Sequence, residues 1–268
     1  MRCAGLLAAA IAMSFMTHAA AADSVRLHAA GSLRTALTEV AAAYEAGGGT
    51  KVSAEFGPSG LLKDKIAQGE PAEVFASANM THPRALHDAG KSGPVVLFAR
   101  NDLCALVRSG LAVETDTLLA TMLDPAVKVG TSTPKADPSG DYAFEVFAKA
   151  EKVKAGARAA LEAKARQLTG GPTSRTAPKG KSLYGELVST GEADIFLTYC
   201  TNAAEAQREY PAQRIVALPD ALGVGADYGL TVMKDASPDA LRFALFILGT
   251  DGQALLAKRG FKGVGLPR

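Results

Sequence analysis

Hydrophobic positions along this chain follow two different periods in turn. Residues 52–56 alternate apolar and polar side chains, as in a half-buried strand, whereas residues 33–44 repeat apolar side chains at helical spacing. The two patterns keep alternating as far as the last strongly apolar strand, at 228–233, and two closing helices at 238–248 and 252–259. This order predicts an α/β fold, with mostly parallel sheets and helices on both faces.

Short apolar runs and amphipathic stretches between them predict the remaining elements. Strands are expected at 25–29, 74–76, 127–130, 195–199 and 215–218. Helices are expected at 61–68, 83–89, 115–122, 142–150, 155–167 and 182–189, with a further short helix from Ala203. Two more apolar runs, 95–98 and 103–107, flank the polar segment 100–102. Two sheets fit the 246 residues that follow residue 22 better than one.

The N-terminus has the pattern of an export signal. Arg2 precedes an apolar run from Leu6 to Met16, and small residues lead to Ala22. This pattern predicts a cleaved signal peptide over residues 1–22. Because Cys3 lies too early for a lipoprotein cleavage site, we expect a soluble periplasmic protein rather than a tethered one.

Composition and charge exclude several classes of protein. The net charge of +2 excludes a strongly basic nucleic-acid binder, and 48% hydrophobic residues exclude a disordered chain. Removal of the signal peptide leaves two cysteines, Cys104 and Cys200. In an oxidising compartment such a pair suggests a disulfide, although two separate buried thiols would fit the sequence as well.

Motifs for catalysis or metal binding are missing from the sequence. The segment Gly180-Lys181-Ser182 resembles the end of a phosphate-binding loop, but Arg175 stands where that motif needs glycine. Neither H-E-x-x-H nor C-x-x-C occurs. We therefore expect no enzyme, no cofactor and no direct metal ligand.

Three serines stand in small-residue turns that open predicted helices. Ser32 and Ser59 follow strands, and Ser139 lies in the turn Pro138-Ser139-Gly140. Free backbone N–H groups and hydroxyls at helix N-termini attract anions. Several such termini together would hold an anion with neutral donors, whereas each serine alone would pass as an ordinary helix N-cap.

Three segments resemble the periplasmic molybdate-binding proteins of ABC importers. They are Ala29–Leu33 (AAGSL), Pro71–Ala78 (PAEVFASA), and Gly252–Ala254 (GQA) followed by Gly260-Phe261. The resemblance covers nearly the whole mature chain. It implies a two-lobed, type II periplasmic binding protein that closes on molybdate or tungstate and passes it to a membrane permease. It also implies a monomer.

The resemblance also implies an oxyanion site made of Ser32, Ser59, Ser139, Lys181 and Tyr199. Ser139 would donate its backbone N–H, and Lys181 stands where the family has a small apolar residue. Two further departures are the turn Gly57-Pro58-Ser59-Gly60, which is usually richer in serine, and Cys200, where glycine is commoner.

The implied architecture sets the limits of the lobes. Residues 23–102 and 229–268 are expected to form a discontinuous first lobe, with 103–228 as the second lobe and a hinge between them.

Two alternatives for the function stay open. A different anion, such as sulfate, phosphate or a carboxylate, would use the basic residues Arg175, Lys179 and Lys181. An exported serine hydrolase would use Ser59 with a histidine base, His28 or His82.

Overall fold

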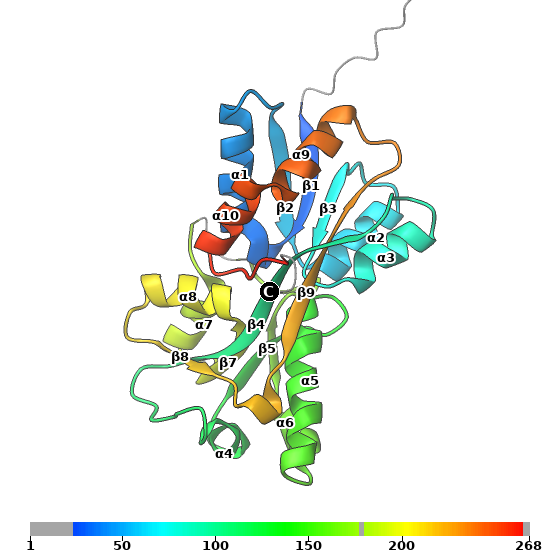
Figure 1. Cartoon of the computed structure of the whole chain (residues 1–268). Helices are drawn as coiled ribbons and strands as arrows, with labels where there is room; N and C mark the ends of the chain where they lie inside the picture. Colours follow the sequence, from blue (N-terminus) through cyan, green and yellow to red (C-terminus); the bar gives the residue numbers. More distant parts are fainter. Residues whose placement is uncertain (1–23, 177–179, 265–268) are drawn as a thin grey trace, which may run out of the picture.

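The structure, a computed structural model, describes residues 24–176 and 180–264. Two lobes of strands and helices lie one above the other, and two long strands connect them (Figure 1). The two-lobed α/β fold predicted from the sequence is therefore confirmed. The predicted signal peptide and Lys179 lie outside the described residues.

The first lobe combines both ends of the described chain. Its N-terminal part consists of β1 (Val25–Ala30), a 3-10 turn η1 (Gly31–Leu33), α1 (Arg34–Ala46), β2 (Val52–Gly57), α2 (Ser59–Ala67), β3 (Val74–Ser77) and α3 (Thr81–Asp88). Its C-terminal part consists of α9 (Pro238–Leu248) and α10 (Thr250–Lys258), which pack beside α1. β1 lies between β2 and β3 in parallel pairings.

The second lobe lies between these two parts in the sequence. Its elements are α4 (Leu118–Leu123), β5 (Val129–Ser132), α5 (Pro138–Val153), α6 (Ala157–Lys164), β6 (Arg166–Thr169), α7 (Leu183–Ser189), β7 (Ile195–Tyr199), α8 (Cys200–Glu209), β8 (Arg214–Ala217) and η2 (Asp220–Leu222). β5 pairs in parallel with both β6 and β7.

Two long antiparallel strands join the lobes. Residues 96–102 of β4 (Val96–Val107) pair with β9 (Gly225–Val232), whereas residues 103–107 pair with β7 and β8. β9 also pairs with β3 in the first lobe. The residue limits predicted for the lobes stay a prediction, because both strands run on through positions 102 and 228.

Two elements differ from the sequence-based expectation. The apolar runs 95–98 and 103–107 belong to one strand, β4, in which the intervening polar residues still pair with β9. The helix expected to reach residue 167 ends at Lys164, and β6 follows it. β6 is an edge strand with exposed polar side chains, so it has no apolar alternation to reveal it. The antiparallel pairings of β4 and β9 join the described strands of both lobes into one mixed, nine-stranded sheet rather than the two mostly parallel sheets expected from the sequence.

The predicted disulfide between Cys104 and Cys200 is present, with 4.9 Å between the Cα atoms. It links β4 to the first residue of α8.

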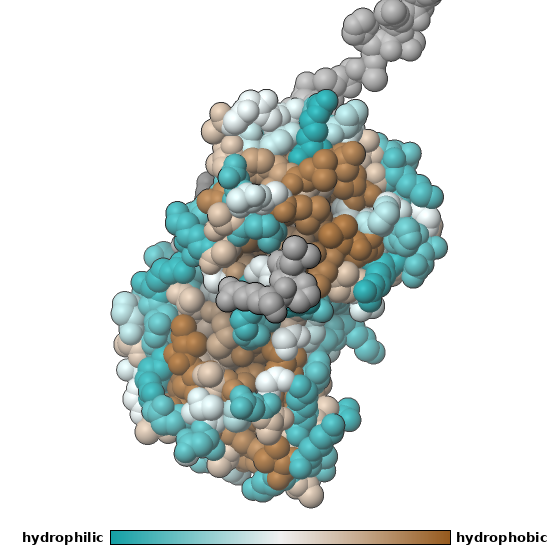
Figure 2. Space-filling model, in the orientation of Figure 1, coloured by the Kyte–Doolittle hydropathy of each residue, from teal (hydrophilic) through white to brown (hydrophobic). Residues whose placement is uncertain are grey.

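The apolar positions of the strands are buried as their patterns predict. Val25, Leu27 and Ala29 of β1 are completely buried against α1 and α9. Apolar surface also gathers over α9, where Leu241 and Leu245 are 53% and 58% exposed (Figure 2).

Within residues 24–176 and 180–264, no single helix is long and apolar enough to span a membrane. α9 and α10 together have the necessary length and composition, but they meet at a 58° bend.

Candidate functional site

A cavity of about 400 Å³ lies between the two lobes, where the ends of β1, β2, β6 and β7 meet the following turns. Four of the five residues predicted for the site, Ser32, Ser59, Lys181 and Tyr199, line this cavity. The fifth, Ser139, lies in the first turn of α5 and is completely buried. Asp137, two residues before it, lines the cavity instead.

Ser32 belongs to a chain of polar groups that joins the two lobes. Its hydroxyl and the hydroxyl of Tyr228 on β9 share a hydrogen bond of 2.9 Å. The amide of Asn101 on β4 donates to the Tyr228 hydroxyl at 3.5 Å and to the Thr201 hydroxyl on α8 at 2.9 Å. Asn101 and Tyr228 are buried, and both lie on the connecting strands. Ser32 is therefore held in position by residues of the two strands that connect the lobes.

Ser59 is the first residue of α2 and is only 1% exposed. Its Oγ accepts a hydrogen bond of 3.1 Å from the backbone N–H of Ala78. Because the hydroxyl serves there as an acceptor, its own hydrogen remains for another partner.

None of the three serines is a helix N-cap. Asp137 caps α5, its Oδ1 accepting a hydrogen bond of 3.0 Å from the backbone N–H of Ser139. Pro138 at the first helical position favours the same start. The Ser139 N–H that the family resemblance assigns to the anion is thus bonded to Asp137, and the buried Oγ of Ser139 has no hydrogen-bond partner in the structure.

Tyr199 ends β7 immediately before α8. Its side chain is 2% exposed, and its hydroxyl has no hydrogen-bond partner in the structure. Burial raises the pKa of Tyr199 well above its usual value, so the hydroxyl keeps its proton. The ring lies close to those of Tyr142 and Tyr228, at centroid distances of 6.2 and 5.7 Å. The disulfide at Cys200, the next residue, ties this position to β4.

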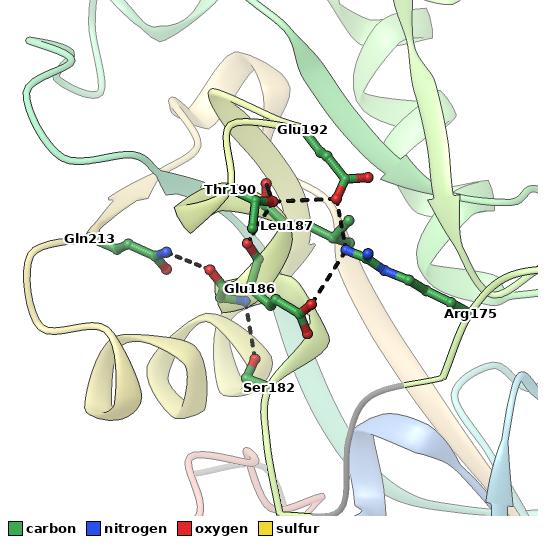
Figure 3. Close-up of polar contacts among 8 residues, drawn as sticks. Arg175, Ser182, Glu186, Leu187, Thr190, Glu192 and Gln213 are labelled. Atoms are coloured by element: carbon green, nitrogen blue, oxygen red, sulfur yellow. Dashed lines mark hydrogen bonds and ion pairs between the residues drawn. The ribbon is translucent and has the colours of Figure 1, made fainter.

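The cationic side chains lie at the border of the cavity. Lys181 is exposed. Arg175 forms ion pairs with Glu192 at 2.8 Å and Glu186 at 3.8 Å, which hold its guanidinium against α7 and the turn that follows (Figure 3). Arg34 lies over the ring of Phe56 and donates to the Phe56 carbonyl.

Two direct contacts hold the lobes together beside the cavity. The backbone N–H of Gly60 donates to the carbonyl of Ala136 at 3.0 Å, and the Tyr142 hydroxyl donates to the carbonyl of Ala78 at 3.3 Å. The structure therefore has its lobes in contact.

His28 and His82, the two histidines that a hydrolase would use as a base, lie apart from Ser59. His28 bonds to Glu70 at 2.9 Å on the face of the first sheet, and His82 lies in a second cavity between the lobes, with Lys63 and Tyr142. Within residues 24–176 and 180–264, no hydrogen bond joins Ser59 to a histidine. The arrangement gives Ser59 no visible activating base.

Sequence reasoning missed three residues of this region, Asp137, Asn101 and Tyr228. Asp137 precedes a proline and has the sequence pattern of a helix N-cap, a role that it does have in α5. Its place on the cavity wall is not visible in that pattern. Asn101 and Tyr228 lie on strands far apart in the sequence, and only the pairing of β4 with β9 brings them together.

Comparisons with known proteins agree on one family. The family described as bacterial extracellular solute-binding protein matches residues 25–262. The uncharacterized protein PM1146 of Pasteurella multocida is 36% identical over 239 residues, which are 88% of this chain and 98% of that protein. The molybdate-binding protein ModA of Mycobacterium tuberculosis is 27% identical over 252 residues, with 90% of this chain and 85% of ModA covered.

A solved structure shows the same fold. The periplasmic molybdate-binding protein of Azotobacter vinelandii superposes with a TM-score of 0.70 at 18% identity, and the match covers 91% of this chain and all of the other.

Proposed function

This chain belongs to the family of bacterial extracellular solute-binding proteins, and on that premise we propose that it binds a tetrahedral oxyanion, molybdate or tungstate, between its lobes. The observation that carries this proposal is the Tyr199 hydroxyl, a buried donor without a partner on the wall of the cavity. A buried hydroxyl without a partner is costly and calls for an explanation, and a bound ligand that accepts its hydrogen bond supplies one.

Neutral donors suit a dianion that carries no proton. The hydroxyls of Ser32, Ser59 and Tyr199 face one cavity, and each can donate one hydrogen to an anionic oxygen. Molybdate, tungstate and sulfate are fully deprotonated near neutral pH, whereas phosphate largely keeps a proton that needs an acceptor. Among the dianions, similarity to the ModA protein of M. tuberculosis favours molybdate and tungstate.

Transport is the role that the family supports. We propose that the chain is exported, that its signal peptide is removed, and that the ligand-bound form delivers the anion to the permease of an ABC importer. The lobe contacts through Gly60 and Tyr142 would stabilise the closed form that a permease distinguishes from the open one.

A different anion bound by cations is the second candidate. Lys181 lines the cavity, which favours this candidate, but the ion pairs of Arg175 with Glu192 and Glu186 occupy that guanidinium. Lys181→Ala therefore separates the two candidates, because it would matter little for a dianion held by neutral donors.

The test is a ligand panel on the mature protein after partial unfolding and dialysis have removed any bound anion. Melting temperature and calorimetry are recorded with molybdate, tungstate, sulfate, phosphate and small carboxylates. Molybdate and tungstate should raise the melting temperature by linkage. Ser32→Ala should weaken their binding about tenfold or more, since a hydrogen bond to a charged group contributes roughly 1.5–3 kcal/mol. Tight binding of phosphate or a carboxylate, with none of molybdate, would contradict the proposal.

A further inference from the structure

Asp137 occupies the place where an anion would meet the N-terminus of α5. Its Oδ1 accepts the backbone N–H of Ser139 at 3.0 Å, and the residue lines the same cavity as Ser59 and Tyr199. A helix N-terminus attracts negative charge, and here a carboxyl group of the chain already supplies it. A bound dianion would therefore lie close to this carboxyl group.

The carboxyl group has little room to move away. A side-chain carbon added at Gly170, which follows β6, would lie 2.5 Å from Oδ2 of Asp137, so the backbone there packs directly against the carboxyl group. On the other side the cap bond to Ser139 holds Oδ1. Ligand binding must be compatible with Asp137 in about this position.

The charges around Asp137 do not neutralise it. The titratable and charged groups around Asp137 and along the cavity come from several elements. They are Lys135 just before α5, Asp141 in its first turn, Arg34 on α1, Glu205 on α8, Arg175 and Lys181 at the cavity border, Tyr184 on α7 and Tyr199 at the end of β7. None of the salt bridges found in the described parts of the chain includes Asp137, and Arg175 is engaged by Glu192 and Glu186. Burial raises the pKa of Asp137 to about 6; the N–H of Ser139 and the hydroxyl of Ser132 oppose this rise, and the charge of Asp141 adds to it.

We propose that Asp137 contacts the bound oxyanion in its protonated form, so that each anion enters the site together with one proton from solvent. The inference rests on the proposed oxyanion function. Protonation removes the repulsion between the carboxylate and the dianion. It also converts the carboxyl group into an O–H donor, which extends the donor set of Ser59 and Tyr199.

This coupling makes the affinity depend on pH in a defined direction. The bound dianion favours the protonated carboxyl group, so the pKa of Asp137 is higher in the complex than in the free protein. Between these two pKa values the affinity falls about tenfold for each unit of rising pH, and below about pH 6 it levels off. Near pH 7.5 each binding event should take up close to one proton.

The experiment is calorimetry with molybdate and tungstate at pH 7.5, in two buffers whose ionisation enthalpies differ widely. The difference in observed heat gives the number of protons taken up. Asp137→Asn is the decisive variant, because asparagine is an equally good N-cap and presents a neutral N–H donor. The variant should bind without proton uptake, and its affinity should change little from pH 6 to pH 8. At pH 8 its affinity should equal or exceed that of the wild type.

Asp141→Asn is the matched control. Asp141 lies in the same first turn of α5, but it is not among the residues that line the cavity. Its Oδ1 accepts a hydrogen bond from the backbone N–H of Lys135. The control should keep the proton uptake of the wild type. Melting curves without ligand check that both variants are folded.

Each remaining outcome would overturn the inference in a recognisable way. Molybdate binding without proton uptake would overturn the role of Asp137 but leave the proposed function intact. Phosphate binding that is tight in the wild type and lost in Asp137→Asn would show that Asp137 accepts a proton from the ligand. No binding of any oxyanion to the wild type would overturn both proposals.

Discussion

The backbone N–H of Gly60 in the first lobe donates a hydrogen bond of 3.0 Å to the carbonyl oxygen of Ala136 in the second. A side-chain carbon at Gly60 would lie 2.4 Å from the carbonyl oxygen of Lys135 and 2.7 Å from that of Ala136. The two backbones therefore approach as closely as they do only because residue 60 is glycine. Gly60 follows Ser59 directly, so this contact lies beside the proposed anion site.

Gly60→Ala should weaken anion binding without destabilising the separate lobes. The added methyl group blocks the closed form, and overpacking of this kind costs about 1–3 kcal/mol, equivalent to a loss in affinity of roughly tenfold or more. In the ligand-free variant the lobes can open to relieve the clash, so the melting temperature without ligand should change little. Calorimetry with molybdate measures the affinity.

Gly225→Ala is the control for this substitution. Its added carbon would meet atoms of Asn101 and Asp102 only at 3.9 Å, an ordinary contact. Equal affinities for Gly60→Ala and Gly225→Ala would contradict the role of Gly60 in closure.

Tyr199→Phe should change stability and binding in opposite directions. The Tyr199 hydroxyl is buried without a partner, and such a group costs about 1–3 kcal/mol. Its removal should raise the melting temperature of the ligand-free protein by roughly 2–4 °C per kcal/mol gained. The same change removes a donor to the anion, and affinity should fall about tenfold or more.

Tyr228→Phe provides the contrast. The Tyr228 hydroxyl is bonded to Ser32 and Asn101, so its loss should lower the stability of the ligand-free protein by about 1 kcal/mol. If Tyr199→Phe proved as destabilising as Tyr228→Phe, the Tyr199 hydroxyl would have a partner within the protein.

Replacing both cysteines, Cys104→Ser with Cys200→Ser, should lower the free energy of unfolding by about 2–4 kcal/mol. The bridge spans 96 residues and restricts the unfolded chain. It also holds the start of α8 next to Tyr199, so affinity should fall as well. Urea unfolding of the oxidised, reduced and substituted proteins measures the effect, and equal midpoints for the oxidised and reduced proteins would contradict it.

The sequence could predict the parts of the site that depend on local pattern. Ser59 follows the alternating strand β2 and Tyr199 ends the apolar strand β7, so their place at a strand end is visible in the sequence. Asp137 was hidden, because an acidic residue before proline is an ordinary helix cap. Its second role arises only when the lobes meet around the cavity.

Long-range pairing accounts for the other differences. β6 begins with two exposed polar residues, Arg166 and Gln167, and its pairing with β5 makes it a strand. The polar residues at 100–102 look like a loop, yet they continue β4 because β9 supplies their hydrogen-bond partners. Gly130 pairs with Arg166 and Asn101 with Ala226, so both partners lie beyond the reach of a local pattern.

Glu73, in the segment Pro71–Ala78 that resembles the molybdate-binding family, serves the structure of the first lobe. Its side chain is 2% exposed; Oε2 accepts the backbone N–H of Arg26 at 2.9 Å, and Oε1 accepts that of Ser237 at 3.0 Å. The carboxylate thus ties β1 to the start of α9. Burial alone would raise the pKa of Glu73, but the hydrogen bonds from the Ser237 and Arg26 backbones, together with the Ser237 hydroxyl and the Arg26 charge, outweigh it and lower the pKa.

Glu73→Gln should therefore lower the free energy of unfolding at neutral pH. It should also make that free energy fall less steeply as the pH is lowered. A lowered pKa in the folded state gives stability that is fully present above the unfolded value, about 4.3, and is lost as the pH falls through the folded value. At pH 7 the variant should lose about 2 kcal/mol, because hydrogen bonds to a charged acceptor become neutral ones. Urea unfolding between pH 7 and pH 3 measures both effects.

Glu114→Gln is the control. Glu114 forms an exposed ion pair with Arg214, so this substitution should change stability by less than about 0.5 kcal/mol. A Glu73→Gln protein whose stability falls with acid as steeply as that of the wild type would show that another carboxyl group dominates the acid response.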